Sequence, residues 1–185
     1  GRTAPWKGYA TLLDGFERAV GQGLDARLEI RGPSSNDAER THRAELAARI
    51  AGSAVLAARA ELAEPVARGG IPSLLGSADA LVTAADSGSA TQTLDKVVYE
   101  ASACAVPVIA SNPALAGYLE GLPVRLDFRP GDAADLARAL LEFGAAPAAL
   151  RERTGLELRE RVERGHSVDT WADRVVAVVR EVSGG

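Results

Sequence analysis

Apolar side chains recur at intervals of three or four positions in several segments, as they do on one face of a helix. The clearest segment is residues 7–20, whose apolar positions are Tyr9, Leu12, Leu13, Phe16 and Val20. It ends at Gly21-Gln22-Gly23, a typical helix stop. Further helices are predicted over residues 37–50, 72–77, 95–104, 113–121, 132–143, 147–164 and 168–182.

Short runs of apolar and β-branched residues alternate with these helices and predict strands. They cover residues 24–32, 53–58, 80–84, 106–110 and 124–128, and residues 61–70 are predicted as a loop. Because strand and helix alternate through the first two thirds of the chain, we expect an α/β fold, a Rossmann-like parallel sheet with helices on both faces. In such sheets ligands bind beyond the carboxyl ends of the strands. The loops expected there, with the opening loop, are residues 1–7, 32–36, 85–93 and 111–113.

The end of the chain is predicted to be a helical C-terminal tail. We expect residues 1–145 to form the Rossmann-like domain and the helices of residues 146–185 to pack on that same domain. The final helix has an apolar stripe that we expect along its inner face, formed by Trp171, Val175, Val178 and Val179.

Residues 86–111 carry the strongest candidate chemistry. A small, polar, Gly-containing loop leads into a helix that has Lys96 in its first turn and Glu100 one turn further on. The amide groups and the dipole of a helix N-terminus favour a phosphate. A carboxylate accepts hydrogen bonds from sugar hydroxyls. The segment therefore predicts a site for a phosphorylated, hydroxylated ligand.

Composition narrows the class of protein. The chain has 185 residues, enough for one domain with a core, and its net charge of −4 argues against a nucleic-acid partner. Cys104 is the single cysteine, so an internal disulfide is excluded and a reducing, cytoplasmic compartment is expected. No apolar run is long enough to span a membrane. His42 and His166 are isolated, no cluster has metal-ligand spacing, and we expect neither metal nor cofactor.

Four stretches of sequence occur in a familiar order. They are Gly-Arg-Thr-Ala-Pro-Trp-Lys-Gly at 1–8, Leu-Glu-Ile-Arg-Gly at 28–32, Ile-Pro-Ser-Leu-Leu-Gly-Ser-Ala-Asp-Ala at 71–80, and residues 96–111. With them the chain resembles the C-terminal, nucleotide-sugar-binding half of the GT-B glycosyltransferases, in particular the retaining family-4 (glycosyl transferases group 1) enzymes. The most specific part is Glu-Ala-x-Ala-Cys-x-x-Pro-Val-Ile-Ala-Ser at 100–111. The resemblance implies a metal-independent enzyme that transfers a hexose from a nucleoside-diphosphate sugar.

The resemblance also implies roles for individual residues. Arg2 and Lys7 hold the donor diphosphate and act as catalytic residues, because they stabilise the charge that develops on the leaving group. Glu100 binds the ribose hydroxyls, and Lys96 also faces phosphate. Gly32 and Ile71 are further donor-binding positions, and at Ile71 the family packs the nucleobase. Gln92, Thr93 and Leu94 are expected beside the donor sugar.

The sequence departs from the family pattern at three places. Gln92 occupies the position of the first of two family acids, and an amide cannot stabilise a developing positive charge. Thr93-Leu94-Asp95 replaces a Gly-aromatic-Gly, and Ala105 replaces a glycine. A catalytically degenerate GT-B-like binding module and a sugar-nucleotide epimerase therefore remain alternatives. A dinucleotide-binding oxidoreductase is disfavoured, because no Gly-x-Gly-x-x-Gly follows a strand.

The resemblance covers only part of the family's architecture. The acceptor-binding N-terminal half is not in the sequence, and the chain, which lacks methionine, starts at Gly1-Arg2. We therefore expect a fragment of a longer polypeptide, with the N-terminal domain as its partner and a peripheral membrane contact made through that missing half. In isolation the chain should bind donor without transferring it.

Overall fold

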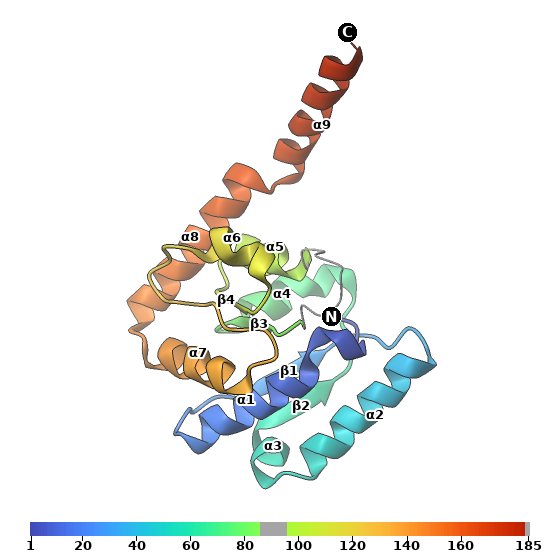
Figure 1. Ribbon diagram of the computed structural model, residues 1–185, viewed down its shortest axis with the longest axis vertical. Helices are drawn as coiled ribbons and strands as arrows, with labels where there is room; N and C mark the ends of the chain where they lie inside the picture. The colour runs from blue at the N-terminus through green and yellow to red at the C-terminus, as the bar shows by residue number, and fades with distance from the viewer. Residues whose placement is uncertain (86–95, 184–185) are drawn as a thin grey trace.

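The computed structural model describes residues 1–85 and 96–183 (Figure 1). Its elements in chain order are η1 (Pro5–Lys7), α1 (Tyr9–Gly21), β1 (Leu28–Arg31), α2 (Asp37–Ala51), α3 (Ala54–Arg59), β2 (Ala60–Ala63), η2 (Arg68–Gly70), α4 (Ile71–Gly76), β3 (Leu81–Thr83), α5 (Lys96–Ala103), β4 (Val108–Ala110), η3 (Pro113–Leu115), α6 (Ala116–Leu119), α7 (Ala133–Ala145), α8 (Ala148–Gly165) and α9 (Val168–Ser183).

The described strands pair in parallel, in two short sheets. Strand β1 pairs with β2 in the register Leu28 to Ala60, and β3 pairs with β4 in the register Leu81 to Val108. Asp127 makes one further parallel bridge, to Ala110 at the end of β4. Every connection between paired strands contains helix, as parallel pairing requires, so the predicted α/β class is confirmed.

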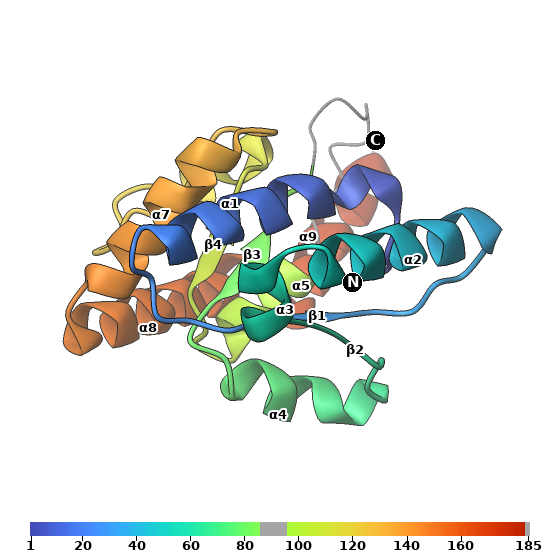
Figure 2. The same cartoon turned by 90° about the horizontal axis from the view of Figure 1, so that it is seen from below.

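Helices cover the strands from two sides. Helix α1 packs along α7 and contacts α2 and α3, whereas α5 packs against α4 and α8 and also contacts β3 and β4. Figure 2 shows α1 and α7 on one side of the strands and α4 on the other. The core between these layers is built mostly from aliphatic side chains, and its fully buried members include Leu13, Leu56, Ile109, Leu126 and Leu136.

Local signals placed several helices correctly. In α1 the predicted apolar face is buried, with Leu13 and Phe16 almost inaccessible to solvent. Helix α2 begins after Asn36, whose side chain accepts a hydrogen bond from the backbone of Glu39. Helix α7 begins after Asp132, which caps two backbone amides in the same way. Caps of this kind satisfy amides that have no partner inside the helix.

The prediction for residues 53–70 was wrong in two places. Residues 53–58 were expected to be a strand, but Ala54–Arg59 is helix α3, because the Ser53 hydroxyl caps it by accepting from the backbone of Leu56. Residues 61–63, expected in a loop, belong to strand β2 (Ala60–Ala63), which pairs with β1. The strand predicted over 124–128 is reduced to the single bridge at Asp127.

The two last helices differ in how they pack. Helix α8 lies against α5 and buries Leu158 and Val162. Helix α9 buries no residue and projects away from the rest of the molecule (Figure 1). The predicted inner face of α9 was therefore wrong: Trp171, Val175, Val178 and Val179 are between 40% and 66% exposed. The division of the chain at residue 145 stays a prediction.

Candidate functional site

The opening segment of the chain lies across the carboxyl ends of two strands. Just beyond β1, Gly32 is so close to this segment that a Cβ atom there would lie 1.5 Å from the Gly1 carbonyl oxygen. Just beyond β3, the Ala84 carbonyl oxygen would lie 1.7 Å from a Cβ atom at Gly8. Gly8 also has a φ of +70°, a conformation that other residues adopt only at a cost. Both glycines therefore allow the opening loop to dock on the sheet.

Arg2 is held by a carboxylate that the sequence analysis missed. Glu39, in the first turn of α2, is 1% exposed, and its Oε1 lies 3.1 Å from Nη1 of Arg2. Its other oxygen accepts a 2.6 Å hydrogen bond from the backbone amide of Ser35. The signal was present in the capping pattern from Asn36 to Glu39, which places an acid three residues after a helix cap.

Further hydrogen bonds fix the backbone of the same loop. The Tyr9 hydroxyl, at the start of α1, donates to the carbonyl oxygens of Gly1 and Arg2. The Thr3 hydroxyl donates to the Glu39 carbonyl at 3.2 Å, and the Thr3 amide donates to Pro33. Thr3 is fully buried. The opening loop is therefore a packed part of the domain.

The guanidinium of Arg2 keeps a solvent-facing side. The Arg2 side chain is 48% exposed, and its Cζ lies 5.7 Å from the centroid of the Trp6 ring. Since a guanidinium has five N–H donors in a planar fork, the contact with Glu39 leaves others for a ligand. Lys7, in η1 of the same loop, is partly buried and has contacts of its own.

Helix α5 presents the second group of predicted residues. Lys96 and Glu100 are both exposed and lie one turn apart, while Val98 and Ala101 face the core. The two side chains thus lie on the solvent-facing side of this helix, and their binding roles stay predictions.

The remaining predicted residues fall in different places. Gln92, Thr93 and Leu94 lie outside the described residues. Ile71 opens α4, where its partly buried side chain packs against the core. Among the described residues, Gly32 packs against the backbone of Arg2, and no hydrogen bond or ion pair links either residue to Ile71 or Glu100.

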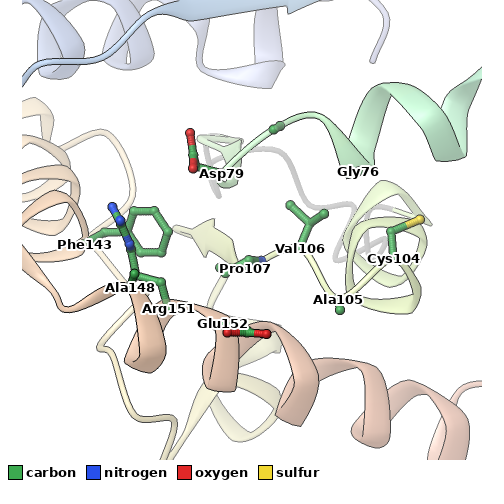
Figure 3. Close-up of a pocket in the computed structure, with 11 residues that line it drawn as sticks. Gly76, Asp79, Cys104, Ala105, Val106, Pro107, Phe143, Ala148, Arg151 and Glu152 are labelled. Carbon is green, nitrogen blue, oxygen red and sulfur yellow. The ribbon is translucent and has the colours of Figure 1, made fainter.

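Two cavities formed by described residues lie away from these positions. One, of about 330 Å³, is at the opposite ends of β3 and β4, where Asp79, Phe143, Arg151 and Glu152 surround Pro107 (Figure 3). The other, of about 800 Å³, lies between α5, α6 and α8. Neither is lined by Arg2, Lys7, Lys96 or Glu100.

The described residues contain no set of three or more His, Cys, Asp or Glu side chains grouped as metal ligands. Likewise, none of the helices in the described ranges is both long and apolar enough to cross a membrane.

The fold is that of the C-terminal, Rossmann-like domain of GT-B glycosyltransferases. Sucrose-phosphate synthase from Thermosynechococcus elongatus superposes with a TM-score of 0.79 at 23% identity, over 100% of this chain and 44% of that one. HepE from Anabaena, solved with UDP and glucose, gives 0.79 at 19% identity over 98% and 47%. A glycosyltransferase from Rickettsia africae gives 0.81 at 17% identity over 98% and 46%. At these identities the likeness establishes the fold alone.

The chain belongs to the family described as Glycosyl transferases group 1, whose sequence pattern matches residues 1–145. A search of curated protein sequences found no match. The chain spans less than half the length of each of the three solved proteins.

Proposed function

We propose that this chain is the donor-binding half of a retaining, metal-independent glycosyltransferase that uses a nucleoside-diphosphate sugar. In the complete protein an N-terminal half binds the acceptor. The complete protein acts in the cytoplasm and makes a peripheral membrane contact through that half. The observation that carries the proposal is the opening loop, packed across the ends of β1 and β3 with the Arg2 guanidinium half-exposed. Family membership supports it independently.

In this proposal the cations of the opening loop bind the diphosphate. Breaking the glycosidic bond leaves extra negative charge on the nucleoside diphosphate, and fixed cations lower the energy of that state. Arg2 is suited to the task, because Glu39 holds one side of its guanidinium while the other can form paired hydrogen bonds with phosphate oxygens. Lys7 adds a second positive charge from the same loop.

The other donor contacts come from the segments that follow the strands. Glu100 accepts hydrogen bonds from the ribose hydroxyls, and Lys96, one turn before it, faces phosphate. Gln92 and the amides of Thr93 and Leu94 contact the donor sugar. Gly32 allows the loop to approach β1, and Ile71 packs beside the base. HepE was solved with UDP, so UDP is the first nucleotide to test.

Isothermal titration calorimetry with UDP and GDP tests the proposal on the 185-residue chain. A charge-assisted hydrogen bond contributes about 1.5–3 kcal/mol, so Lys7→Ala should weaken binding about tenfold or more. Arg18→Ala is the matched control, because Arg18 is an exposed cation at the far end of α1. If both nucleotides bind Lys7→Ala as tightly as the unaltered chain, Lys7 is not in the site. If neither binds the unaltered chain at millimolar concentration, the donor-binding function is wrong.

A catalytically degenerate binding module is the second candidate, because Gln92 stands where the family has an acid. The two candidates differ in turnover. Gln92→Glu in the full-length protein should restore or raise sugar transfer if only this side chain limits it. A full-length protein that binds nucleotide but shows no transfer with either residue at position 92 supports the binding module.

A further inference from the structure

A second candidate site lies away from the residues proposed to bind the donor. It is the groove of about 800 Å³ between α5, α6 and α8, which lie together in Figure 1. We refer to it as the α5–α8 groove. The residues with functional side chains that line it are Tyr99, Tyr118, Glu120, Arg161, Arg164 and His166.

Three rings from three elements form one wall of the α5–α8 groove. The imidazole of His166 stacks on Tyr99 at a centroid distance of 4.6 Å and an interplanar angle of 23°. Tyr118 meets both rings edge-on, each at 5.4 Å. Such edge-to-face and offset contacts are favourable arrangements for aromatic rings. The wall is therefore ordered by contacts among α5, α6 and the end of α8.

Two arginine side chains of α8 also line the groove. Arg161 and Arg164 lie three residues apart on α8, so they share one helix face. Nη1 of Arg161 donates to the Tyr118 carbonyl at 2.5 Å, but within the described part of the chain Arg161 has no carboxylate partner. The one acid in the lining is Glu120, and Arg164 also pairs with Glu160, four residues earlier on α8, at 3.5 Å. The lining itself therefore has two arginines against one acid, in a chain whose net charge is −4.

The titratable groups of the groove are partly shielded from water. Burial, with a smaller contribution from the charge of Arg174 on α9, lowers the pKa of His166. Burial raises the pKa of the Tyr99 and Tyr118 hydroxyls, which therefore stay protonated and can donate hydrogen bonds at neutral pH. The guanidinium groups, the His166 ring and the Tyr99 hydroxyl are thus potential donors to an anion. The Tyr118 hydroxyl instead donates to the Leu158 carbonyl at 3.3 Å.

We propose that the α5–α8 groove binds a small ligand through a phosphate or similar oxyanion, held by the guanidinium groups of Arg161 and Arg164 and by the imidazole of His166. Arginine presents paired N–H donors that match the oxygens of such groups. The C-terminal end of α8 has a partial negative charge that opposes an anion, so both arginines are needed. Among the residues that the structure describes, none of those proposed for the donor site lines the groove, so we treat the two sites as separate.

An NMR titration of the chain tests this proposal, with the imidazole of His166 as reporter. The chain has two histidines, so a His42→Gln variant assigns the His166 signal. Glucose 6-phosphate should shift this signal saturably and raise the pKa of His166, because a bound oxyanion favours the imidazolium. Vesicles of phosphatidylcholine with or without phosphatidic acid form the parallel arm, which distinguishes a lipid headgroup from a soluble phosphate.

Matched variants separate the α5–α8 groove from other anion sites. Arg164→Gln should weaken the response about tenfold or more. The Arg164 side chain is exposed and its ion pair with Glu160 spans 3.5 Å, so the variant should stay folded, which thermal unfolding checks. Arg159→Gln, on the same helix and paired with Glu163 at 2.9 Å, should leave the response unchanged. Lys7→Ala removes a proposed donor contact and should also leave it unchanged.

The outcomes are decisive in either direction. A saturable response to glucose 6-phosphate supports a soluble ligand, and a response only to vesicles that contain phosphatidic acid supports a lipid headgroup. No response of His166 to either probe overturns the proposal. An equal response in Arg164→Gln and in the unaltered chain also overturns it.

Discussion

Replacing Gly8 by alanine should displace the opening loop from the end of β3. The new Cβ would lie 1.7 Å from the Ala84 carbonyl oxygen and 2.6 Å from its carbon, and Gly8 has a φ of +70°. Ala84 is 3% exposed and directly follows β3, so it has little room to retreat. The left-handed conformation costs alanine about 1–2 kcal/mol, and the overlap adds about 1–3 kcal/mol. We therefore expect the variant to lose about 3 kcal/mol of unfolding free energy.

Thermal unfolding followed by circular dichroism measures that loss. For a domain of this size, 3 kcal/mol corresponds to about 6–12 °C in Tm. The control is Gly21→Ala, because Gly21 ends α1 with no atom within 4 Å of a new Cβ. That variant should be unchanged or more stable by up to about 1 kcal/mol.

Calorimetry with UDP on the same Gly8→Ala variant links the loop to function. Arg2 and Lys7 move with the loop, so UDP affinity should fall about tenfold or more, like the loss expected for removing one cation. A Tm equal to that of the unaltered chain would show that the contact between Gly8 and Ala84 is wrong. A lower Tm with unchanged UDP affinity would show instead that the opening loop is no part of the donor site.

Three further predictions concern α8 and the turn it covers. In Gly155→Ala the new Cβ would lie 1.9 Å from the Ala105 carbonyl oxygen, so Tm should fall by about 6–12 °C. The control is Gly165→Ala on the same helix, where no atom lies within 4 Å of the new Cβ, and it should change the unfolding free energy by less than about 1 kcal/mol. Ala105 has a φ of +57°, so Ala105→Gly should raise the unfolding free energy by about 0.5–1 kcal/mol after the added freedom of the unfolded chain is subtracted. Ala103→Gly, at the last residue of α5, should not raise it. Equal effects of the two substitutions in chemical denaturation would refute the strain at position 105. Because burial lowers the pKa of His166, the imidazole binds a proton more readily in the unfolded chain than in the folded one. The unfolding free energy should therefore fall as pH drops through about 6.5 towards the lower pKa of the folded chain. Denaturation curves of His166→Gln should lack this pH-dependent loss.

The family's preference for glycine at position 105 has a structural explanation. By the resemblance described above, Ala105 stands in place of a glycine. In the structure this residue has a left-handed backbone, and Gly155 of α8 packs directly on its carbonyl. The tight turn between α5 and β4 therefore holds Ala105 in a strained, left-handed backbone conformation.

The sequence by itself determined the elements whose signals are local. The apolar face of α1 and the helices that begin after Asn36 and Asp132 were predicted, because a helix face and a helix start each involve residues within one or two turns. The family was readable as well, since its stretches of residues keep their order and spacing. The helix at Ser53 could have been predicted from the same kind of signal, because its cap is also local.

Tertiary structure decided the rest, because the interactions involved join distant parts of the chain. Strand β2 has no distinctive sequence and exists through its pairing with β1, about thirty residues earlier. The ion pair between Arg2 and Glu39 depends on the opening loop crossing the start of α2. The apolar stripe of α9 has the period of a buried helix, yet periodicity shows only that a face can be buried, and which surface covers it depends on the packing of the whole protein.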